Sequence, residues 1–159
     1  MRKRPEKFSL AGMMPSWAKT MVFIYDFTQT PQTTELTMDV AEIIAIWFKK
    51  VIMPDFNDRQ TLPQGLNASA PQLVFIFCDR WVEATFRMTN TLVTEYPSAG
   101  VIAVFVQKVK VQVGDVRRAG VKSAFIFDGD YETVLTSIDQ VLSGNEFYSG
   151  FQDRIGNAG

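Results

Sequence analysis

The sequence predicts a doubly wound α/β sandwich, in which helices cover both faces of a parallel β-sheet. Short apolar runs rich in Val, Ile and Phe recur along the chain, and they are continuous rather than alternating, which is typical of strands buried on both faces. Stretches with helical periodicity lie between these runs, so right-handed crossovers connect the strands. With 159 residues, 47% of them hydrophobic, the chain can form one domain with a sizeable core.

Five strands are expected from these runs. The sequences MVFIY, LVFIF, VIAVFV and SAFIF predict strands at residues 21–25, 73–77, 101–106 and 123–127. A weaker strand is predicted around residues 51–53.

The first helix is expected to begin directly after the first strand. Thr30 followed by Pro31 predicts an N-cap with proline at the first helical position. The helix then presents one apolar face, made of Leu36, Val40, Ile43, Ile44 and Trp47.

Two later helices follow from the same periodicity. One apolar face after the 73–77 strand consists of Trp81, Ala84, Met88 and Leu92. The last helix is expected to be capped by Asp130, to end before Gly144 at C′, and to bury Val134, Ile138, Val141 and Leu142.

Two segments have weaker patterns. Residues 54–71 contain three prolines and little periodicity, so any helix there is short or irregular. Residues 107–120 alternate like a strand at Val109, Val111 and Val113, but Val116 extends a helical spacing. We expect a short, weak helix toward the C-terminal half of this segment, because Gly114 disfavours a longer one.

The composition excludes several kinds of chemistry. The chain contains no histidine, which excludes a Ser-His-Asp triad, a Cys-His pair and any His-ligated zinc site. The single cysteine, Cys78, adjoins a buried strand and is expected to be an inert thiol. One cysteine, no secretory signal and no apolar run of about 20 residues together predict a cytoplasmic protein without membrane contact.

The charge is unevenly distributed. Residues 1–20 carry a net charge of +4 and the rest of the chain about −5. We interpret residues 1–20 as a flexible, solvated basic tail, and contact with nucleic acid or an acidic partner is the alternative.

Residues 21–145 resemble the receiver domain of a two-component response regulator, most closely the class that carries a LuxR/NarL-type DNA-binding domain. The resemblance rests on YPSAGVIAVFV (96–106), on VRRAGVKSAFIFDG (116–129) with its Ala119-Gly120 pair, on SIDQVLSGNEFYS (137–149), and on the spacing from Phe77 to Pro97. It implies a CheY-like (flavodoxin-like) five-stranded sheet of strand order 2-1-3-4-5. Residues 146–159 would then be a C-terminal linker.

The residues that carry out phosphoryl chemistry in that family are replaced here. The acidic pair after the first strand reads Asp26-Phe27, and Phe77, Phe105 and Phe127 occupy the phosphoacceptor, hydroxyl and lysine positions. Mg²⁺ requires a shell of oxygens, and acyl phosphate formation requires a carboxylate nucleophile. The resemblance therefore implies a degenerate pseudo-receiver with no metal, no cofactor and no enzymatic activity.

The phenylalanine residues should lie together where the strand ends converge. We expect the four rings to pack with one another and to fill the site with core. Asp79, two residues beyond the phosphoacceptor position, is expected to cap the next helix rather than to replace the lost acid.

Function is then expected to reside on a surface. The resemblance implies a phosphorylation-independent protein-interaction and dimerisation module in bacterial signal transduction and transcription regulation. The interface candidates are Val109, Val111, Ala124, Tyr131 and Leu135. We expect a homodimer or another signalling protein as partner, with DNA contacted only through a C-terminal domain that is absent from this sequence.

The alternative is a small-molecule-sensing domain that binds an apolar ligand at the strand ends, lined by Phe27, Phe77, Phe105 and Phe127. A flavodoxin-like enzyme is disfavoured, because residues 26–30 lack a glycine-rich phosphate loop.

Overall fold

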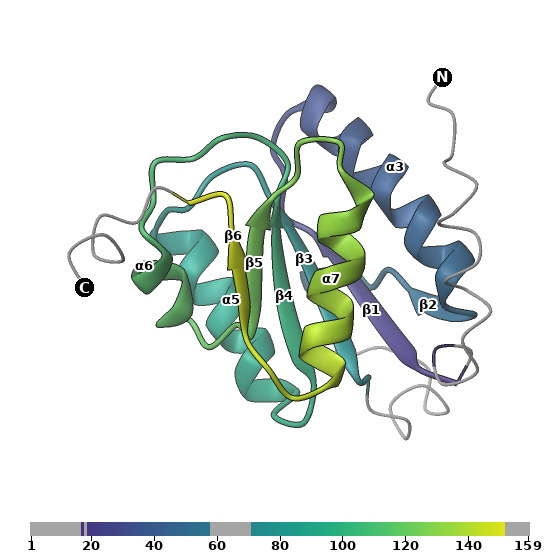
Figure 1. The fold of residues 1–159 in the computed structure, drawn as a ribbon. Helices are drawn as coiled ribbons and strands as arrows, with labels where there is room; N and C mark the ends of the chain where they lie inside the picture. The colour runs from purple at the N-terminus through teal and green to yellow at the C-terminus, as the bar shows by residue number, and fades with distance from the viewer. Residues whose placement is uncertain (1–16, 18, 58–70, 152–159) are drawn as a thin grey trace.

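A six-stranded parallel sheet runs through the middle of the computed structural model, which describes Trp17, residues 19–57 and residues 71–151 (Figure 1). The strands are β1 (Met21–Asp26), β2 (Lys50–Ile52), β3 (Leu73–Cys78), β4 (Gly100–Phe105), β5 (Ser123–Ile126) and β6 (Phe147–Ser149). Their spatial order is β2-β1-β3-β4-β5-β6, and every neighbouring pair is parallel. The predicted CheY-like order 2-1-3-4-5 is confirmed.

The sixth strand was not predicted. Strand β6 pairs with β5 and lies within residues 146–159, which the sequence assigned to a linker. The strand has only three residues, FYS, and these are half-buried, so no continuous apolar run marked it. The sheet therefore extends beyond the five strands that the sequence predicts.

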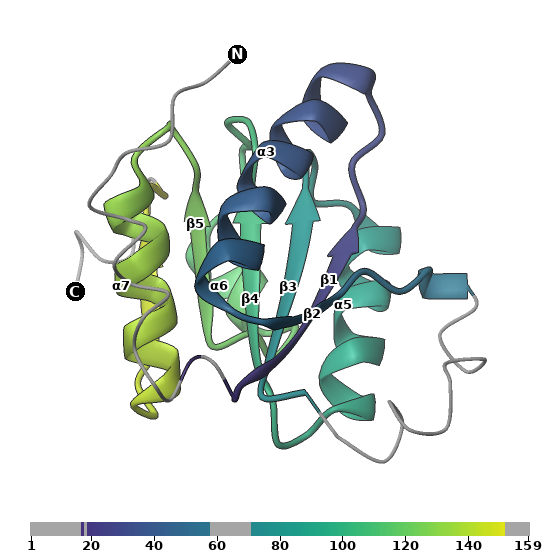
Figure 2. The same ribbon diagram turned by 90° about the vertical axis from the view of Figure 1, so that its right-hand side faces the viewer.

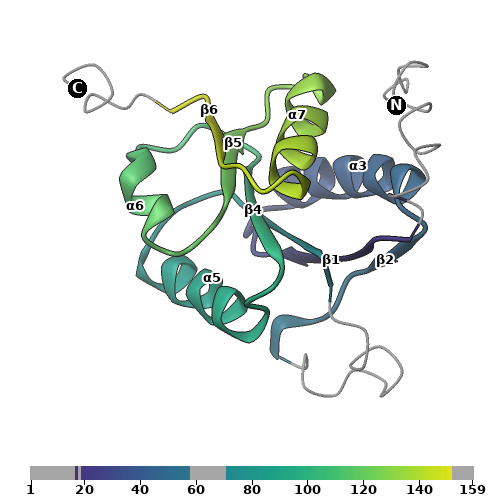
Figure 3. The ribbon, with the colours of Figure 1, turned by 60° about the horizontal axis from the view of Figure 1, so that its bottom comes forward.

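Helices cover both faces of the sheet, as predicted. They are α3 (Pro31–Trp47), α5 (Glu83–Glu95), α6 (Val113–Arg117) and α7 (Tyr131–Leu142). Figures 2 and 3 show α3 and α7 on one face and α5 and α6 on the other. Two hydrophobic cores result: an α3/α7 core and an α5/α6 core, separated by the sheet.

Helix α3 begins as the sequence predicts. Thr30 is the N-cap, its side-chain oxygen accepts a hydrogen bond from the backbone N–H of Thr33, and Pro31 is the first helical residue. The predicted face is directed at the core, since Val40 and Trp47 are fully buried.

Helix α5 buries part of the predicted face, since Leu92 is fully buried and Met88 packs against the α5/α6 core. Trp81 lies before the helix and Ala84 is exposed, whereas Thr85, Thr89 and Leu92 are buried. The periodicity placed the helix start too early, because Trp81 was counted as its first apolar residue. The Thr89 hydroxyl is buried without a hydrogen-bond partner.

Helix α7 is capped by Asp130, whose carboxylate accepts a hydrogen bond from the backbone N–H of Glu132. The prediction that Leu142 belongs to the buried face is wrong, because this residue is 39% exposed. Val134, Ile138 and Val141 are buried as predicted, and the Val141 side chain fills the space that a Cβ on Gly100 would occupy. The short helix predicted toward the C-terminal half of residues 107–120 is confirmed as α6.

The predicted tail contributes one residue to the core. Trp17 is only 3% exposed, and its ring stacks on Phe48 at a centroid distance of 4.8 Å and meets Trp47 edge-on at 6.3 Å. The rest of the tail up to residue 16, and residues 58–70 of the proline-rich segment, lie outside the described residues. None of the helices in the described part of the chain is both long and apolar enough to cross a membrane.

Candidate functional site

The predicted site residues meet at the carboxyl end of the sheet. Asp26, the last residue of β1, lies opposite Phe77 of β3. The backbone N–H of Phe27 donates to the Phe77 carbonyl at 2.8 Å, and that of Phe127 donates to the Phe105 carbonyl at 2.8 Å. The sheet hydrogen bonds thus continue past the strand ends and bring all of these positions to one edge.

The four phenylalanine rings are buried, but they do not form one cluster. Phe77 and Phe127 belong to the α3/α7 core, and Phe27 and Phe105 to the α5/α6 core. The expectation that all four pack together is wrong. In the sheet, Phe105 lies opposite Cys78 rather than opposite Phe77, so the two rings point to opposite faces.

Each ring packs on an aromatic neighbour of its own face. Phe77 stacks on Phe75, and Phe127 meets Tyr131 at a centroid distance of 5.1 Å. On the other face, the centroid of Phe105 lies 5.9 Å from Trp81 and 5.7 Å from Phe151, and that of Phe27 lies 5.5 Å from Phe56. The four positions that the resemblance assigns to phosphoryl chemistry are thus part of both cores.

Asp26 is the exposed member of the set. Its carboxylate accepts hydrogen bonds from the backbone N–H and the hydroxyl of Thr28, which close a tight turn after β1. Within residues 19–57 and 71–151, no three side chains of the histidine, cysteine or carboxylate types gather closely enough to hold a metal ion.

Asp79 has a role that the sequence did not reveal. It does not cap the next helix, since Val82 is the N-cap of α5. Its carboxylate is buried and accepts hydrogen bonds from the backbone N–H of Gln29 at 2.6 Å and from the hydroxyl of Thr33 at 2.9 Å. Arg80 donates to the second oxygen at 3.2 Å.

A third loop is tied to the same residue. The side-chain amide of Gln107, after β4, donates to the backbone carbonyl of Asp79 at 2.7 Å. Asp79 therefore connects the loops that follow β1, β3 and β4. The only signal in the sequence was an acid placed directly after a fully apolar run.

The environment fixes the charge states of Asp79 and Cys78. Burial by itself would raise the pKa of Asp79, but the hydrogen bonds from Gln29, Thr33 and Arg80 outweigh it and hold the pKa below the ordinary value of 3.8. Burial, together with the negative charges of Asp79 and Asp26, raises the pKa of the Cys78 thiol far above its usual range. The thiol is therefore neutral at physiological pH.

The interface candidates are less exposed than the sequence suggested. Ala124 is fully buried and Tyr131 is 8% exposed, packed on Trp47 and Phe127, so neither can form part of an apolar rim. Val109 and Val111 are partly buried against the α5/α6 core, and Leu135 is partly buried against the α3/α7 core. The large apolar side chains that are exposed among the described residues are Met38, Met53, Val82 and Leu142.

The end of the described chain packs beside the site. The hydroxyl of Tyr148 in β6 donates to the Val121 carbonyl at 2.9 Å, and Arg117 lies over the Tyr148 ring and pairs with Glu146. Two residues after β6, Phe151 reaches the ring of Phe105. The segment that follows β6 is thus in contact with Phe105 at the end of β4.

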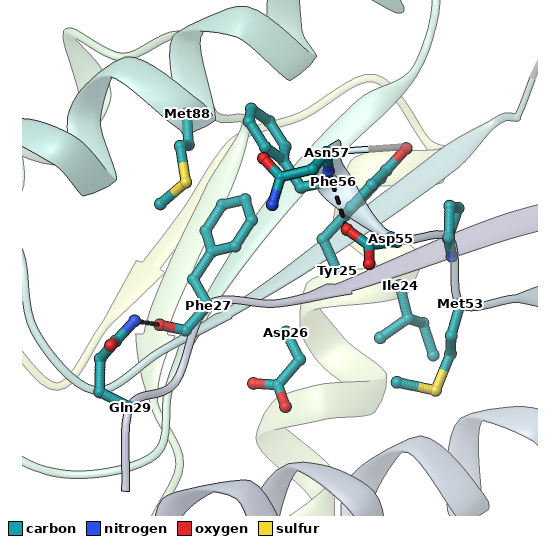
Figure 4. Close-up of a pocket in the computed structure, with 11 residues that line it drawn as sticks. Ile24, Tyr25, Asp26, Phe27, Gln29, Met53, Asp55, Phe56, Asn57 and Met88 are labelled. Carbon is teal, nitrogen blue, oxygen red and sulfur yellow. Dashed lines mark hydrogen bonds between the residues drawn. The ribbon is translucent and has the colours of Figure 1, made fainter. Parts of the chain in front are cut away.

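A pocket of about 400 Å³ opens beside the end of β1 (Figure 4). Of the four phenylalanine residues expected to line a ligand site, only Phe27 lines it. Its other walls come from β1, the chain after β2 and α5, and include Tyr25, Asp26, Gln29, Met53, Asp55, Phe56, Asn57 and Met88.

Comparison with protein-family models gives no match, and no curated protein matches the sequence. Solved structures do match. The isolated REC domain of RcsB from Salmonella enterica serovar Typhimurium, in the presence of the phosphomimetic BeF₃⁻, has a TM-score of 0.55 and 10% identity, and the match covers 82% of this chain and 94% of that one.

Two further structures support the same conclusion. The Salmonella typhimurium RcsB response regulator matches with a TM-score of 0.55 and 12% identity over 81% of this chain and 62% of that one. A LuxR family DNA-binding response regulator from Silicibacter pomeroyi matches with a TM-score of 0.54 and 14% identity over 82% and 96%. At these identities the likeness shows the fold, and the chain has the CheY-like fold of response-regulator receiver domains.

Proposed function

We propose that this chain is a phosphorylation-independent receiver-like domain that works by binding other proteins, itself included, in bacterial signal transduction. The observation that carries the proposal is the complete burial of Phe77 within β3, at the position where receivers hold the phosphoacceptor. A phenylalanine ring offers no nucleophile, and its core packing leaves no room for a phosphoryl group.

The nearby carboxylates do not supply a substitute. Asp79 has no exposed side-chain surface, and one of its oxygens already accepts two hydrogen bonds. A phosphodonor would have to displace the β1–α3 loop to reach it. Asp26 is exposed, but a single carboxylate is a poor Mg²⁺ site, since the ion requires an octahedral shell of oxygens. We therefore propose that the domain is not an enzyme.

The hydrogen bonds of Asp79 support a single, permanent arrangement of the strand-end loops. In a switchable domain, two arrangements of similar free energy must be available. Here the buried carboxylate of Asp79 links the loop after β3 to the loop after β1 and to helix α3, and its backbone carbonyl accepts from Gln107 after β4, so moving these loops apart would break hydrogen bonds of polar groups at this site. A domain locked in this way suits constitutive binding of a partner.

The proposed partners follow from the proposed lack of phosphorylation. Because the domain has no phosphorylation step to trigger association, a constitutive homodimer or a standing complex with another signalling protein is the expected state. A role in transcription regulation in the cytoplasm would require a DNA-binding domain outside this sequence, of the kind named for the LuxR family regulator.

The test is to incubate the protein with Mg²⁺ and acetyl phosphate, or with beryllofluoride, beside the RcsB receiver domain as a positive control. We expect no phosphate adduct by intact mass and no change in the NMR spectrum of this protein, because Phe77 offers no nucleophile, Asp79 is buried and Asp26 alone is a poor Mg²⁺ site. A stoichiometric phosphoaspartyl adduct at any residue would overturn the proposal. If an adduct appeared, loss of it in Asp79→Asn would identify the acceptor.

A further inference from the structure

Helix α3 carries a row of carboxylates on the side that faces away from the sheet. Glu35, Asp39 and Glu42 recur at spacings of four and three residues, opposite the buried Val40 and Ile44. Glu35 and Glu42 are exposed and Asp39 is half-buried. The helix, Pro31–Trp47, contains no lysine or arginine. The outer side of α3 is therefore negatively charged, with no cation supplied by the helix itself.

Helix α7 extends the negative surface. Glu132 and Asp139 are exposed, and no lysine or arginine occurs in Tyr131–Leu142. The two helices lie side by side on one face of the sheet (Figures 2 and 3), and Trp47 of α3 meets Tyr131 of α7 edge to face at a centroid distance of 6.4 Å. The outer sides of α3 and α7, which we call the acidic face, thus carry five carboxylates and have a negative potential.

The acidic face also has apolar surface. Leu36 and Ile46 of α3 and Leu135 of α7 pack against the α3/α7 core but are only partly buried. A segment docked here removes more of their apolar surface from water, which favours docking. The segment that fits this face therefore has both basic and apolar side chains.

Trp17 brings a segment of that composition to the acidic face. Its ring stacks on Phe48 and meets Trp47 edge-on, so the chain enters the domain at the C-terminal end of α3. Residues 1–16, which we call the N-terminal segment, precede it. Residues 2–7 contain four basic side chains and one acidic side chain, a net charge of +3. Residues 8–14 contain four large apolar side chains, Phe8, Leu10, Met13 and Met14.

The N-terminal segment is long enough to follow α3 from end to end. An extended chain spans about 3.3 Å per residue, so residues 1–16 reach about 50 Å, whereas α3 with its 17 residues is about 26 Å long. Attachment at Trp17 keeps the segment beside the face at an effective concentration of about 1 mM. A single exposed ion pair stabilises little, but several opposite charges on a tethered segment act together.

We propose that residues 1–16 dock back onto the acidic face of their own domain, with Trp17 as the anchor. The basic side chains of residues 2–7 pair with carboxylates of α3 and α7, and the apolar side chains of residues 8–14 cover the apolar surface of Ile46 and Leu135. A partner protein can then use this face only by displacing the N-terminal segment. This inference goes beyond the interaction role proposed above and does not depend on it.

A spin label on the full chain tests where the N-terminal segment lies. The chain has one cysteine, Cys78, which is fully buried, so Ser9→Cys provides an accessible thiol for a nitroxide. NMR then compares the intensity of each backbone amide signal with the nitroxide oxidised and reduced. We expect loss of intensity along α3 as far as Glu35 and on the outer side of α7, and none on α5 and α6. A segment that does not dock would broaden only the signals around Trp17.

A mixed sample separates docking within one chain from docking between two chains. Spin-labelled protein without ¹⁵N is mixed with an equal amount of ¹⁵N-labelled parent, so that only contact between two chains can broaden a signal. We expect no loss of intensity in this mixture, because the segment of each chain occupies the acidic face of its own domain.

Matched double variants test the role of charge. Glu35→Gln combined with Glu42→Gln removes two carboxylates from the acidic face, and the signals of α3 and α7 should regain most of their intensity, because the attraction to the basic side chains is weakened. Glu83→Gln combined with Asp115→Asn removes two exposed carboxylates from the α5/α6 side and is the control, which should leave the broadening as in the parent. Raising the salt concentration from about 0.05 M to about 0.5 M should act like the first double variant, since salt screens exposed charges.

The pattern of signal loss decides the proposal in either direction. Loss confined to the surroundings of Trp17, equal loss on both faces of the sheet, or loss that Glu35→Gln with Glu42→Gln leaves unchanged would each overturn it. Loss in the mixed sample that matches the loss in the labelled sample would also overturn it, because the segment of a second copy would then be the occupant. Loss along α3 and α7 that depends on their carboxylates and is absent from the mixture would support it.

Discussion

At the residue scale, Phe77 separates this domain from one that can be phosphorylated. Its ring is fully buried in β3 and stacks on Phe75. We expect Phe77→Asp to lower the free energy of unfolding by at least about 4 kcal/mol, since a large core side chain is lost and an unpaired acid is buried. Urea denaturation measures this. Phe77→Leu, which keeps an apolar side chain, should cost much less. Equal stability of the Asp variant and the parent would mean that position 77 is not core.

The buried carboxylate of Asp79 should make the stability of the fold depend on pH. Its pKa is lower in the folded protein than the ordinary value of 3.8, so folding favours the charged form. The stabilisation is fully present above the unfolded pKa and is lost as the pH falls through that value toward the folded pKa. In Asp79→Asn, the stability at neutral pH should drop by about 1.5–3 kcal/mol, because charged hydrogen bonds are lost.

The comparison of Asp79→Asn with the parent should itself depend on pH. The difference in unfolding free energy should stay constant from neutral pH to about pH 5 and shrink below about pH 4, where the carboxylate of the unfolded chain takes up a proton that the folded state binds less readily. Asp115→Asn, in an exposed pair with Arg118, serves as the control and should change stability little at any pH. A difference that did not shrink in acid would show that Asp79 does not stabilise the fold through its charge.

At the element scale, the sequence predicted the strands and helices that have a long apolar or periodic pattern of their own, and missed the short strand β6. The strands with continuous apolar runs and helix α3, with its Thr30-Pro31 start, were predicted close to their observed positions. Strand β6 was missed because its three residues are only half-buried and its pairing is with a distant partner, β5. Short strands of this kind are defined by tertiary contacts rather than by a pattern of their own.

The candidate site, too, could be predicted only in part from the sequence. The sequence identified which residues meet at the strand ends, since the ends of parallel strands share one edge. It did not identify on which face each ring lies, because that depends on a one-residue difference in register between Phe77 and Phe105. Nor could it identify the bonds of Asp79 to Gln29, Thr33 and Gln107, which join segments far apart in the chain.

Two glycine variants test whether the close packing of Gly150 against Ile126 holds β6 on the sheet. Gly150 has φ of +91°, and a Cβ there would lie 3.3 Å from the Cβ of Ile126, whereas Gly129 has φ of +100° and open space around it. Alanine at either position should cost about 1 kcal/mol for the backbone conformation. Gly150→Ala should in addition loosen β6 and speed hydrogen exchange of its amides. Equal exchange of β6 in both variants would mean that the contact with Ile126 does not hold the strand.

At the scale of the whole molecule, the question is which surface makes a dimer. Strand β6 lies at the β5 edge, between α6 and α7, so this face differs from that of a five-stranded receiver (Figure 1). Tyr131 and Ala124 are buried and cannot contribute. Leu135 and Val111 pack on the cores, so charged substitutions there would disturb the fold as well as any interface. On α7, the exposed large apolar residue is Leu142.

We expect the protein to be a homodimer in solution with Leu142 at the interface, because two-fold dimers are the commonest oligomers and α7 exposes this leucine beside β6. Leu142→Glu should shift the mass measured by light scattering toward the monomer across a range of concentrations, without changing thermal stability of the fold itself. Val82→Glu is the matched control, since Val82 is 49% exposed at the start of α5 on the other face of the sheet. A parent that is monomeric at high concentration would exclude homodimerisation and leave a different protein as the partner. Dissociation by Val82→Glu but not by Leu142→Glu would move the interface to α5.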